Sequence, residues 1–295
     1  MKARKGWLFT AMLALAWASA HAAHPLDDRV WDTRSKRFIS TEAAYEQAAS
    51  SRHLLLGETH DSEFHHRLQL EALRAIARRD RKPTLLMEQF DREHQTALAA
   101  AQSRNGIDAE ALADAGKLDR RGWGWPLYKD LIQFAAERKW PIAAANLSRT
   151  EAREIAMGRQ KAELPDIGAD AIAALEKDIV NGHCGHRLPQ DRLTSIVQAQ
   201  RARDAAMAEA IEASTPPTVL IAGAGHVRRD RAVPKYLKDG KDVLVIAYVE
   251  TAEGKDQPQA YDHAGFDLLW FTPPTRRDDP CKQPLTGAVA KEEKP

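Results

Sequence analysis

Polar side chains that could carry acid–base chemistry follow four apolar runs of this sequence. Glu58 and His60 follow "HLLLG", Glu88 follows "TLLM", Asn146 ends "PIAAAN", and His226 follows "GAG". Carboxylates and imidazoles are the side chains that most often transfer protons or bind metal ions in proteins. Because residues two apart in an extended segment point the same way, Glu58 and His60 can face the same space.

The runs before these residues predict the strands of a sheet. They are short and apolar without alternation, which is typical of strands covered on both faces, and longer helical patterns separate them. The predicted strands span residues 53–57, 84–88, 141–146, 218–225, 242–250 and 267–271. In a parallel sheet the carboxyl ends of the strands share one rim, where ligands bind. We therefore expect the polar residues to meet at that rim.

The predicted fold class is α/β, with a mixed, largely parallel central sheet, helices on both faces and a helical insertion. Apolar residues at helical spacing predict helices over 62–79 and 190–214. The alanine-rich, polar segment 92–118 is expected to form the insertion. A chain of 295 residues is long, yet one large α/β domain is its simplest organisation.

The two ends of the chain differ from its middle in composition. Residues 1–22 combine a basic start, an apolar stretch and a small-x-small end, which predicts a cleaved secretory signal peptide. Since no Cys lies near the cleavage point, we expect a periplasmic protein without a lipid anchor or stable membrane insertion. Residues 23–272 form the predicted domain, and residues 273–295 have little to bury and are predicted to be disordered.

Charge and cysteine content narrow the classes of partner. The chain has 43 Lys and Arg against 42 Asp and Glu, and the predicted signal peptide holds three of the bases and no acid. The mature chain therefore has a net charge of about −2, which makes nucleic acid an unlikely partner class. In an oxidising compartment Cys184 and Cys281 are free to pair, although two free thiols or an interchain bond are equally open.

Burial and backbone freedom single out Glu88 and three glycines. Glu88 directly follows three apolar residues, so its carboxylate is expected to be buried and to need a cation, a metal ion or hydrogen-bond donors. Gly57, Gly223 and Gly225 fit either a close backbone approach or a positive φ before each His. The "GAG" element lacks the third glycine of a dinucleotide fingerprint, which excludes that type of site.

Two Gly-x-x-His elements, "GETH" at 57–60 and "GAGH" at 223–226, occur with a Glu in "LLMEQF". In this combination the chain resembles the Tiki/TraB/erythromycin-esterase-type superfamily. The segments "GWGWPLYKDLIQFAAERKWPIAAANLSR", "HCGHRLP" and "QRARDAAMA" are most similar to the ChaN group of haem-binding uptake proteins. The resemblance covers about residues 50–250. It implies a mixed α/β fold, haem binding and a role in iron acquisition, with an outer-membrane haem receptor as a partner.

The resemblance implies a haem site with an axial ligand and an apolar surface. Tyr128, in "GWGWPLY" with Trp123 and Trp125, is the first candidate for the iron ligand. His183 and His186, on either side of Cys184, are candidates for a second ligand across a homodimer. The chain has no Cys-x-x-Cys-His, so covalent c-type attachment is excluded.

Two alternatives remain open from the sequence. The first is a metal-dependent hydrolase of peptidase or esterase type, in which His60 and His226 act as base or divalent-metal ligands and Glu58 and Glu88 orient, ligate or act as acid. The second is a non-catalytic scaffold that keeps an inherited polar site. Whether the protein is an enzyme is left undecided by the residues alone.

Overall fold

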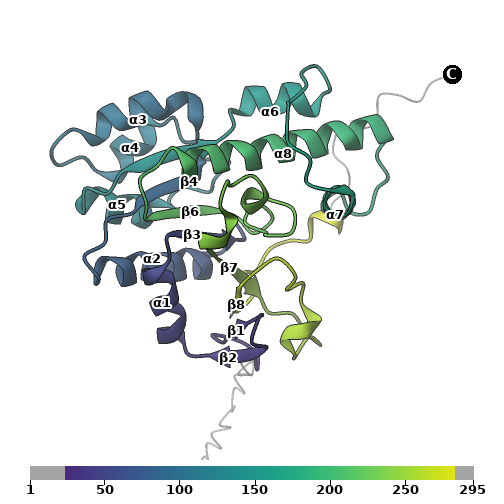
Figure 1. The fold of residues 1–295 in the computed structure, drawn as a ribbon, viewed down its shortest axis with the longest axis horizontal. Coiled ribbons are helices and arrows are strands. Elements are labelled where there is room, and N and C mark those ends of the chain that lie inside the picture. Colours follow the sequence, from purple (N-terminus) through teal and green to yellow (C-terminus); the bar gives the residue numbers. More distant parts are fainter. Residues whose placement is uncertain (1–23, 283–295) are drawn as a thin grey trace, which may run out of the picture.

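A computed structural model describes residues 24–282, which form one eight-stranded sheet with helices on both faces (Figure 1). The strands lie side by side in the order β2-β1-β8-β7-β3-β6-β4-β5. The six from β8 to β5 pair in parallel, while β1 pairs antiparallel with both β8 and β2. The strand bounds are β1 Val30–Asp32, β2 Arg37–Ile39, β3 His53–Glu58, β4 Thr84–Asp91, β5 Ile142–Asn146, β6 Thr218–Gly223, β7 Val243–Glu250 and β8 Leu268–Thr272.

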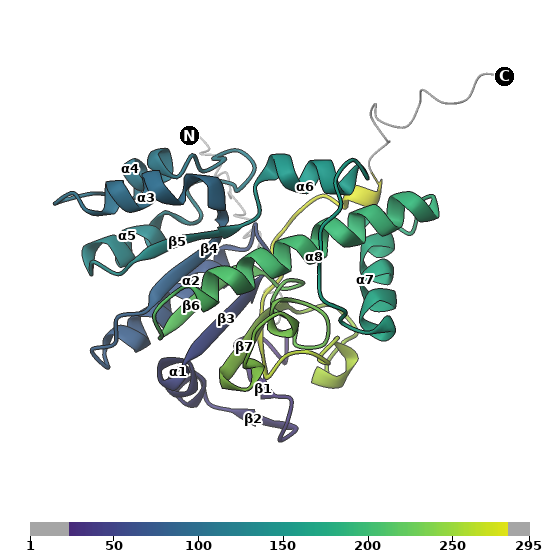
Figure 2. The same cartoon turned by 45° about the horizontal axis from the view of Figure 1, so that its top comes forward.

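Alternate residues of the buried strands build two cores, one on each face of the sheet. In β3, Leu54 and Leu56 join the core packed under α1, α2, α4 and α5, whereas Leu55 joins the core packed under α8. Figure 2 shows α8 lying across the face opposite α2. The helix bounds are α1 Thr41–Ser50, α2 Glu63–Ala77, α3 Gln95–Gln102, α4 Ala109–Ala115, α5 Lys129–Glu137, α6 Arg149–Ala156, α7 Ala169–Gly182 and α8 Gln190–Glu212.

The insertion after β4 protects the edge of the sheet. Gln102 of α3 accepts from Ile142 N at 2.7 Å and donates to Ile142 O at 2.9 Å. Gln95, about two turns earlier on the same helix, accepts from Ala144 N at 2.7 Å. Two glutamine side chains thus bond the free backbone groups of edge strand β5, which would otherwise be open to pairing with another chain.

The predicted α/β fold, with its mixed and largely parallel sheet, is confirmed. All six predicted strands are present, and the predicted insertion contains α3 and α4. The short antiparallel strands β1 and β2 were not predicted from the sequence. Each has three residues, which is too short for a recognisable alternation.

The predicted signal peptide lies outside the described residues, so the division of the chain into three parts stays a prediction. The predicted disordered tail needs one correction, because residues 273–282 are held against the domain. Arg277 bonds Asp61 and Glu250 at 2.6–2.9 Å, and Cys281 forms a disulfide with Cys184. Residues 283–295 lie outside the described part.

None of the helices in residues 24–282 is long and apolar enough to cross a membrane.

Candidate functional site

The carboxyl ends of β3, β4, β5 and β6 bring the predicted polar residues to one rim of the sheet. Glu58, Glu88, Asn146 and His226 are all buried there, with between 2% and 7% of each residue exposed. The His60 side chain, in the loop after β3, is 45% exposed. The rim therefore has a buried polar floor and one accessible imidazole.

The first half of the site is built around the Glu58 carboxylate. Its Oε1 lies 3.0 Å from His60 Nδ1 and accepts a hydrogen bond from Tyr128 OH at 2.5 Å. Its Oε2 accepts from Gln69 Nε2 at 2.6 Å. Burial raises the pKa of Glu58, but the His60 hydrogen bond and the nearby His66 ring more than offset this and hold that pKa below its ordinary value. Glu58 is thus an ionised anchor that fixes the His60 ring.

The first turn of α2 supports this half of the site. His66 Nε2 donates to the carbonyl oxygen of His60 at 3.0 Å, and His66 Nδ1 lies 3.4 Å from Glu58 Oε2. Burial lowers the pKa of His60, whereas the hydrogen bond to Glu58 and the charge of Glu88 raise it, and the net direction is upward. The carboxylates around His60 therefore favour its protonated form.

The second half of the site joins β6 to α8. Asp204, on the sheet-facing side of α8, lies 2.6 Å from His226 Nδ1. His226 Nε2 lies 3.4 Å from Glu88 Oε1 and 3.1 Å from Gln200 Nε2. Burial lowers the pKa of His226, but Glu88 and Asp204 outweigh burial and raise it. Burial raises the pKa of Asp204, and the neighbouring imidazole partly offsets that.

Glu88 lies between the two halves. Its Oε2 accepts from Gly223 N at 2.8 Å, and its Oε1 faces His226. A Cβ at Gly223 would lie 3.0 Å from Cε1 and Nε2 of His60 and 3.8 Å from Glu88 Oε2. The close-approach interpretation thus holds for Gly223, and also for Gly57, where a Cβ would meet Val227 at 2.5 Å. Neither glycine has a positive φ, and a Cβ at Gly225 would meet no described atom within 4 Å.

Two imidazoles with buried carboxylate partners on Nδ1 are therefore arranged around a third carboxylate. A carboxylate on Nδ1 orients an imidazole and sets its tautomer, which leaves Nε2 to donate or accept a proton. The geometry supports acid–base chemistry on a group placed near Glu88. Among residues 24–282, no three His, Cys, Asp or Glu side chains are placed to share a metal ion.

The structure places Tyr128 with the predicted rim residues, but not as an accessible ligand. Tyr128 is 0% exposed and its hydroxyl donates to Glu58. Burial and the Glu58 charge raise the pKa of its phenol, which disfavours the phenolate that iron would bind. That Tyr128 ligates iron stays a prediction, and in this structure the Tyr128 hydroxyl holds Glu58.

The "HCGH" loop after α7 lies on the rim side of the molecule. His183 and His186 are both exposed, and His183 Nδ1 donates to Ile179 O at 2.7 Å. Arg277 bonds Asp61, the residue directly after His60. Only three residues lie between Arg277 and Cys281, so the Cα atoms of these two residues are at most about 14 Å apart. The disulfide to Cys184 then fixes the loop at the same side (Figure 1).

Sequence reasoning missed four residues that complete the site: His66, Gln69, Gln89 and Asp204. Asp204 could have been predicted to be buried, because it lies seven residues after Val197 and seven before Ile211 on the apolar face of α8. A carboxylate within an apolar stripe needs a partner. The other three carry no signal without knowledge of how α2 and β4 lie at the rim.

The fold and the rim define the class of protein: an α/β protein with a polar site at the carboxyl ends of parallel strands. The sequence profile of the haem-binding uptake proteins of the Tiki superfamily, ChaN, matches residues 44–237. The chain belongs to this family. A search of curated protein sequences found no match.

One solved structure shows the same fold, and others match less well. The chain is similar to ChaN of Campylobacter jejuni, whose structure is described for cofacial haem binding, with 22% identity, a TM-score of 0.69, and coverage of 82% of this chain and 95% of that one. The type III effector HopBA1 matches with 15% identity, a TM-score of 0.45 and coverage of 79% and 92%. The erythromycin esterase EreC matches with 11% identity, a TM-score of 0.40 and coverage of 79% and 78%.

Proposed function

We propose that this protein binds haem and acts in haem or iron uptake in the periplasm. The observation that carries the proposal is the family match over residues 44–237, which include both Gly-x-x-His elements and the "GWGWPLY" segment. The neighbour from C. jejuni binds haem cofacially, which supports a homodimer of this chain around haem. An outer-membrane haem receptor remains the proposed partner.

The side chains on the rim side fit a haem with imidazole ligation. Haem iron needs an accessible ligand atom, and the porphyrin needs a flat apolar contact. His60 is half-exposed, its Nδ1 is held by Glu58, and its ring meets the edge of Trp123 with centroids 5.0 Å apart. A hydrogen-bonded carboxylate behind an imidazole is the usual support for a metal ligand. The exposed pair His183 and His186 offers a second imidazole source.

The experiment is a haemin titration of the mature chain, followed by absorbance and gel filtration. A saturable Soret shift with a simple stoichiometry, accompanied by a change from monomer to dimer, is the expected result. An unsaturable, linear rise in absorbance, equal to that of an unrelated protein, would reject haem binding.

A second candidate function is acid–base hydrolysis at the rim, and the contacts of Glu88 favour it. Glu88 lies 3.4 Å from His226 Nε2 and shares the space around Gly223 with His60. This is where a water molecule could be activated. Hydrolysis of a panel of small esters and peptides that is abolished by Glu88→Gln, but not by Glu46→Gln on α1, where Glu46 pairs with Arg79, would establish it. Equal rates in the two variants would refute it.

A further inference from the structure

A small pocket of about 310 Å³ opens beside the rim site. Gln89, Lys117, Trp123, Asn146 and Arg203 line it, and we call it the rim pocket. It adjoins both halves of the site, because Gln89 Nε2 donates to Glu58 Oε1 at 3.4 Å and the charge of Arg203 acts on His226. Trp123 contacts the ring of His60 at its edge.

Two cations of the rim pocket have no carboxylate partner within the described residues. Arg203 donates to Asn146 Oδ1 at 2.8 Å, and Lys117 is exposed without an ion pair in residues 24–282. Three further titratable side chains and one more cation line the pocket. Arg149 pairs with Asp119 at 2.7 Å, the Asp91 carboxylate accepts from the backbone N–H of Arg149 at 3.2 Å, and His94 Nε2 lies 3.4 Å from Glu93 Oε1. Within the described residues, Asn146 takes up one of the five guanidinium N–H groups of Arg203 and the other four have no protein acceptor.

A buried acceptor in the same pocket points to a ligand independently. Gln89 is 2% exposed, and its Oε1 is buried without a hydrogen-bond partner among residues 24–282. The amide cannot turn over without placing Oε1 against the Glu58 carboxylate. Buried acceptors without a partner are rare in proteins, since leaving one unpaired is unfavourable. A donor bound in the pocket would satisfy this acceptor.

We propose that the rim pocket binds the carboxylate of a ligand, with Arg203 and Lys117 supplying the positive charge. Gln89 Oε1 accepts from a hydroxyl or amino group beside the carboxylate, or from a water that the carboxylate holds. Two sources have this chemistry: a propionate of haem, and a free small hydroxy acid. In either case the carboxylate anchors the remainder of the ligand beside His60. The propionate source rests on the proposed haem binding, whereas the free-acid source does not.

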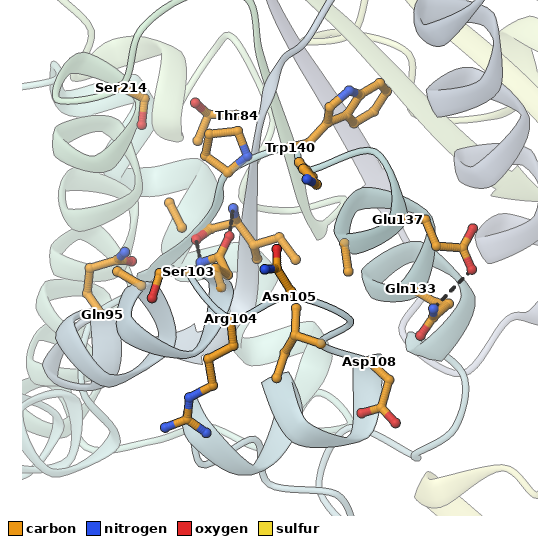
Figure 3. Close-up of a pocket in the computed structure, with 18 of the residues that line it drawn as sticks. Thr84, Gln95, Ser103, Arg104, Asn105, Asp108, Gln133, Glu137, Trp140 and Ser214 are labelled. Atoms are coloured by element: carbon orange, nitrogen blue, oxygen red, sulfur yellow. Dashed lines mark hydrogen bonds between the residues drawn. The ribbon is translucent and has the colours of Figure 1, made fainter.

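A second pocket, at the amino ends of the strands, supplies a matched control. It is larger, about 850 Å³, and lies at the amino ends of β4 and β5 next to Thr84 and Trp140 (Figure 3). Arg104, on the loop after α3, lines it. Arg104→Gln removes a cation from a pocket that has no contact with the rim.

The test compares Arg203→Gln, Lys117→Gln and Arg104→Gln with the unsubstituted mature chain. Three probes are used: haemin and haemin dimethyl ester by absorbance titration, and malate by calorimetry. Lys117 is exposed, so its variant is expected to fold even where Arg203→Gln does not. Loss of a charge-assisted contact is expected to weaken carboxylate binding about tenfold or more, with no change in Arg104→Gln.

The pattern of results identifies the source. Weaker haemin binding in the two rim variants, with dimethyl ester binding unchanged, assigns the pocket to a propionate. Malate binding to the unsubstituted chain that is lost in the rim variants, with haemin unaffected, assigns it to a free hydroxy acid. If haemin does not bind at all, haem binding fails while the malate measurement still decides the pocket. Equal affinities of every probe for all four proteins, or no binding of haemin and malate, would overturn the proposal.

Discussion

At the scale of single residues, the site consists of imidazoles whose properties depend on buried carboxylates. Glu58, His60, Glu88, Asn146 and His226 could be predicted because each ends or follows a recognisable apolar run, and parallel strands share a rim, although β4 continues past Glu88 to Asp91. Their partners could not be predicted in the same way. Asp204 reaches His226 only because α8 crosses the sheet at one particular angle, and no local pattern encodes that crossing.

Tyr128→Phe tests whether the phenol holds Glu58 or binds iron. Loss of a donor to a buried carboxylate is expected to lower the free energy of unfolding by about 1–3 kcal/mol. The absorbance spectrum of the haem complex should keep its ligand-dependent bands, since Tyr128 is buried. Urea unfolding and a haemin titration of the variant measure both. Disappearance of those bands at unchanged stability would identify Tyr128 as the ligand.

The raised pKa of His226 predicts that the free energy of unfolding falls at alkaline pH. Burial opposes protonation, but Glu88 and Asp204 raise the pKa of His226 to about 9 from the model-peptide value of 6.5. Its contribution is fully present below pH 6.5 and is lost as the pH rises through about 9. Asp204, whose pKa burial raises to about 6, is mostly ionised above pH 7, so its own titration falls at the acidic end of this window.

The measurement is urea unfolding of the wild-type chain and His226→Gln between pH 6.5 and 9.5. The wild-type chain should lose on the order of 2–3 kcal/mol over this range, and the variant should lose clearly less. Parallel curves for the two proteins would show that His226 is not the group that titrates.

At the scale of elements, the strands and the two long helices were predictable because their apolar periodicity is strong. The short strands β1 and β2 were not, and the function of the insertion became visible only from its contacts. Gln95 and Gln102 of α3 cap edge strand β5, so the insertion closes the sheet as well as extending the domain. The glycines that precede the two His residues set how closely β3 and β6 can approach the rim loops.

Alanine substitutions at Gly57 and Gly225 test whether these glycines are needed for close packing or for backbone conformation. A Cβ at Gly57 would lie 2.5 Å from Val227 Cγ2 and 3.0 Å from Ala224 Cα, so Gly57→Ala must displace backbone. We expect it to lower the free energy of unfolding by about 1–3 kcal/mol. Gly225→Ala, with nothing within 4 Å, is the matched control and should be near neutral. Similar losses in thermal unfolding of the two variants would contradict this account.

At the scale of the whole molecule, one disulfide joins the "HCGH" loop to the end of the described chain. The sequence allowed the pair Cys184 and Cys281 but could not choose it, because 97 residues separate the two and only the fold brings them together. The same contact makes residues 273–282 part of the domain. In this way the loop that carries His183 and His186 is fixed on the side of the site.

Loss of this bond is expected to weaken the whole domain. A crosslink over so long a separation restricts the unfolded chain strongly, and its removal typically costs about 2–4 kcal/mol. Cys184→Ser with Cys281→Ser should therefore unfold at a lower urea concentration than the oxidised wild-type chain. The reduced wild-type chain should match the double variant. Two free thiols in a non-reducing peptide map of the purified protein would contradict the pairing itself.

The most direct test of the account is a haemin titration of four mature proteins by absorbance. They are the wild-type chain, His60→Ala, the double variant His183→Ala with His186→Ala, and His53→Ala. His53 is the matched control, since it begins β3 at its amino end, whereas His60 follows the carboxyl end of the same strand. We expect a saturable Soret shift for the wild-type chain and His53→Ala, and a displaced Soret band or an affinity about tenfold lower for at least one of the other two. No saturable shift in the wild-type chain, or identical spectra and affinities in all four proteins, would contradict haem binding through imidazoles on the rim side.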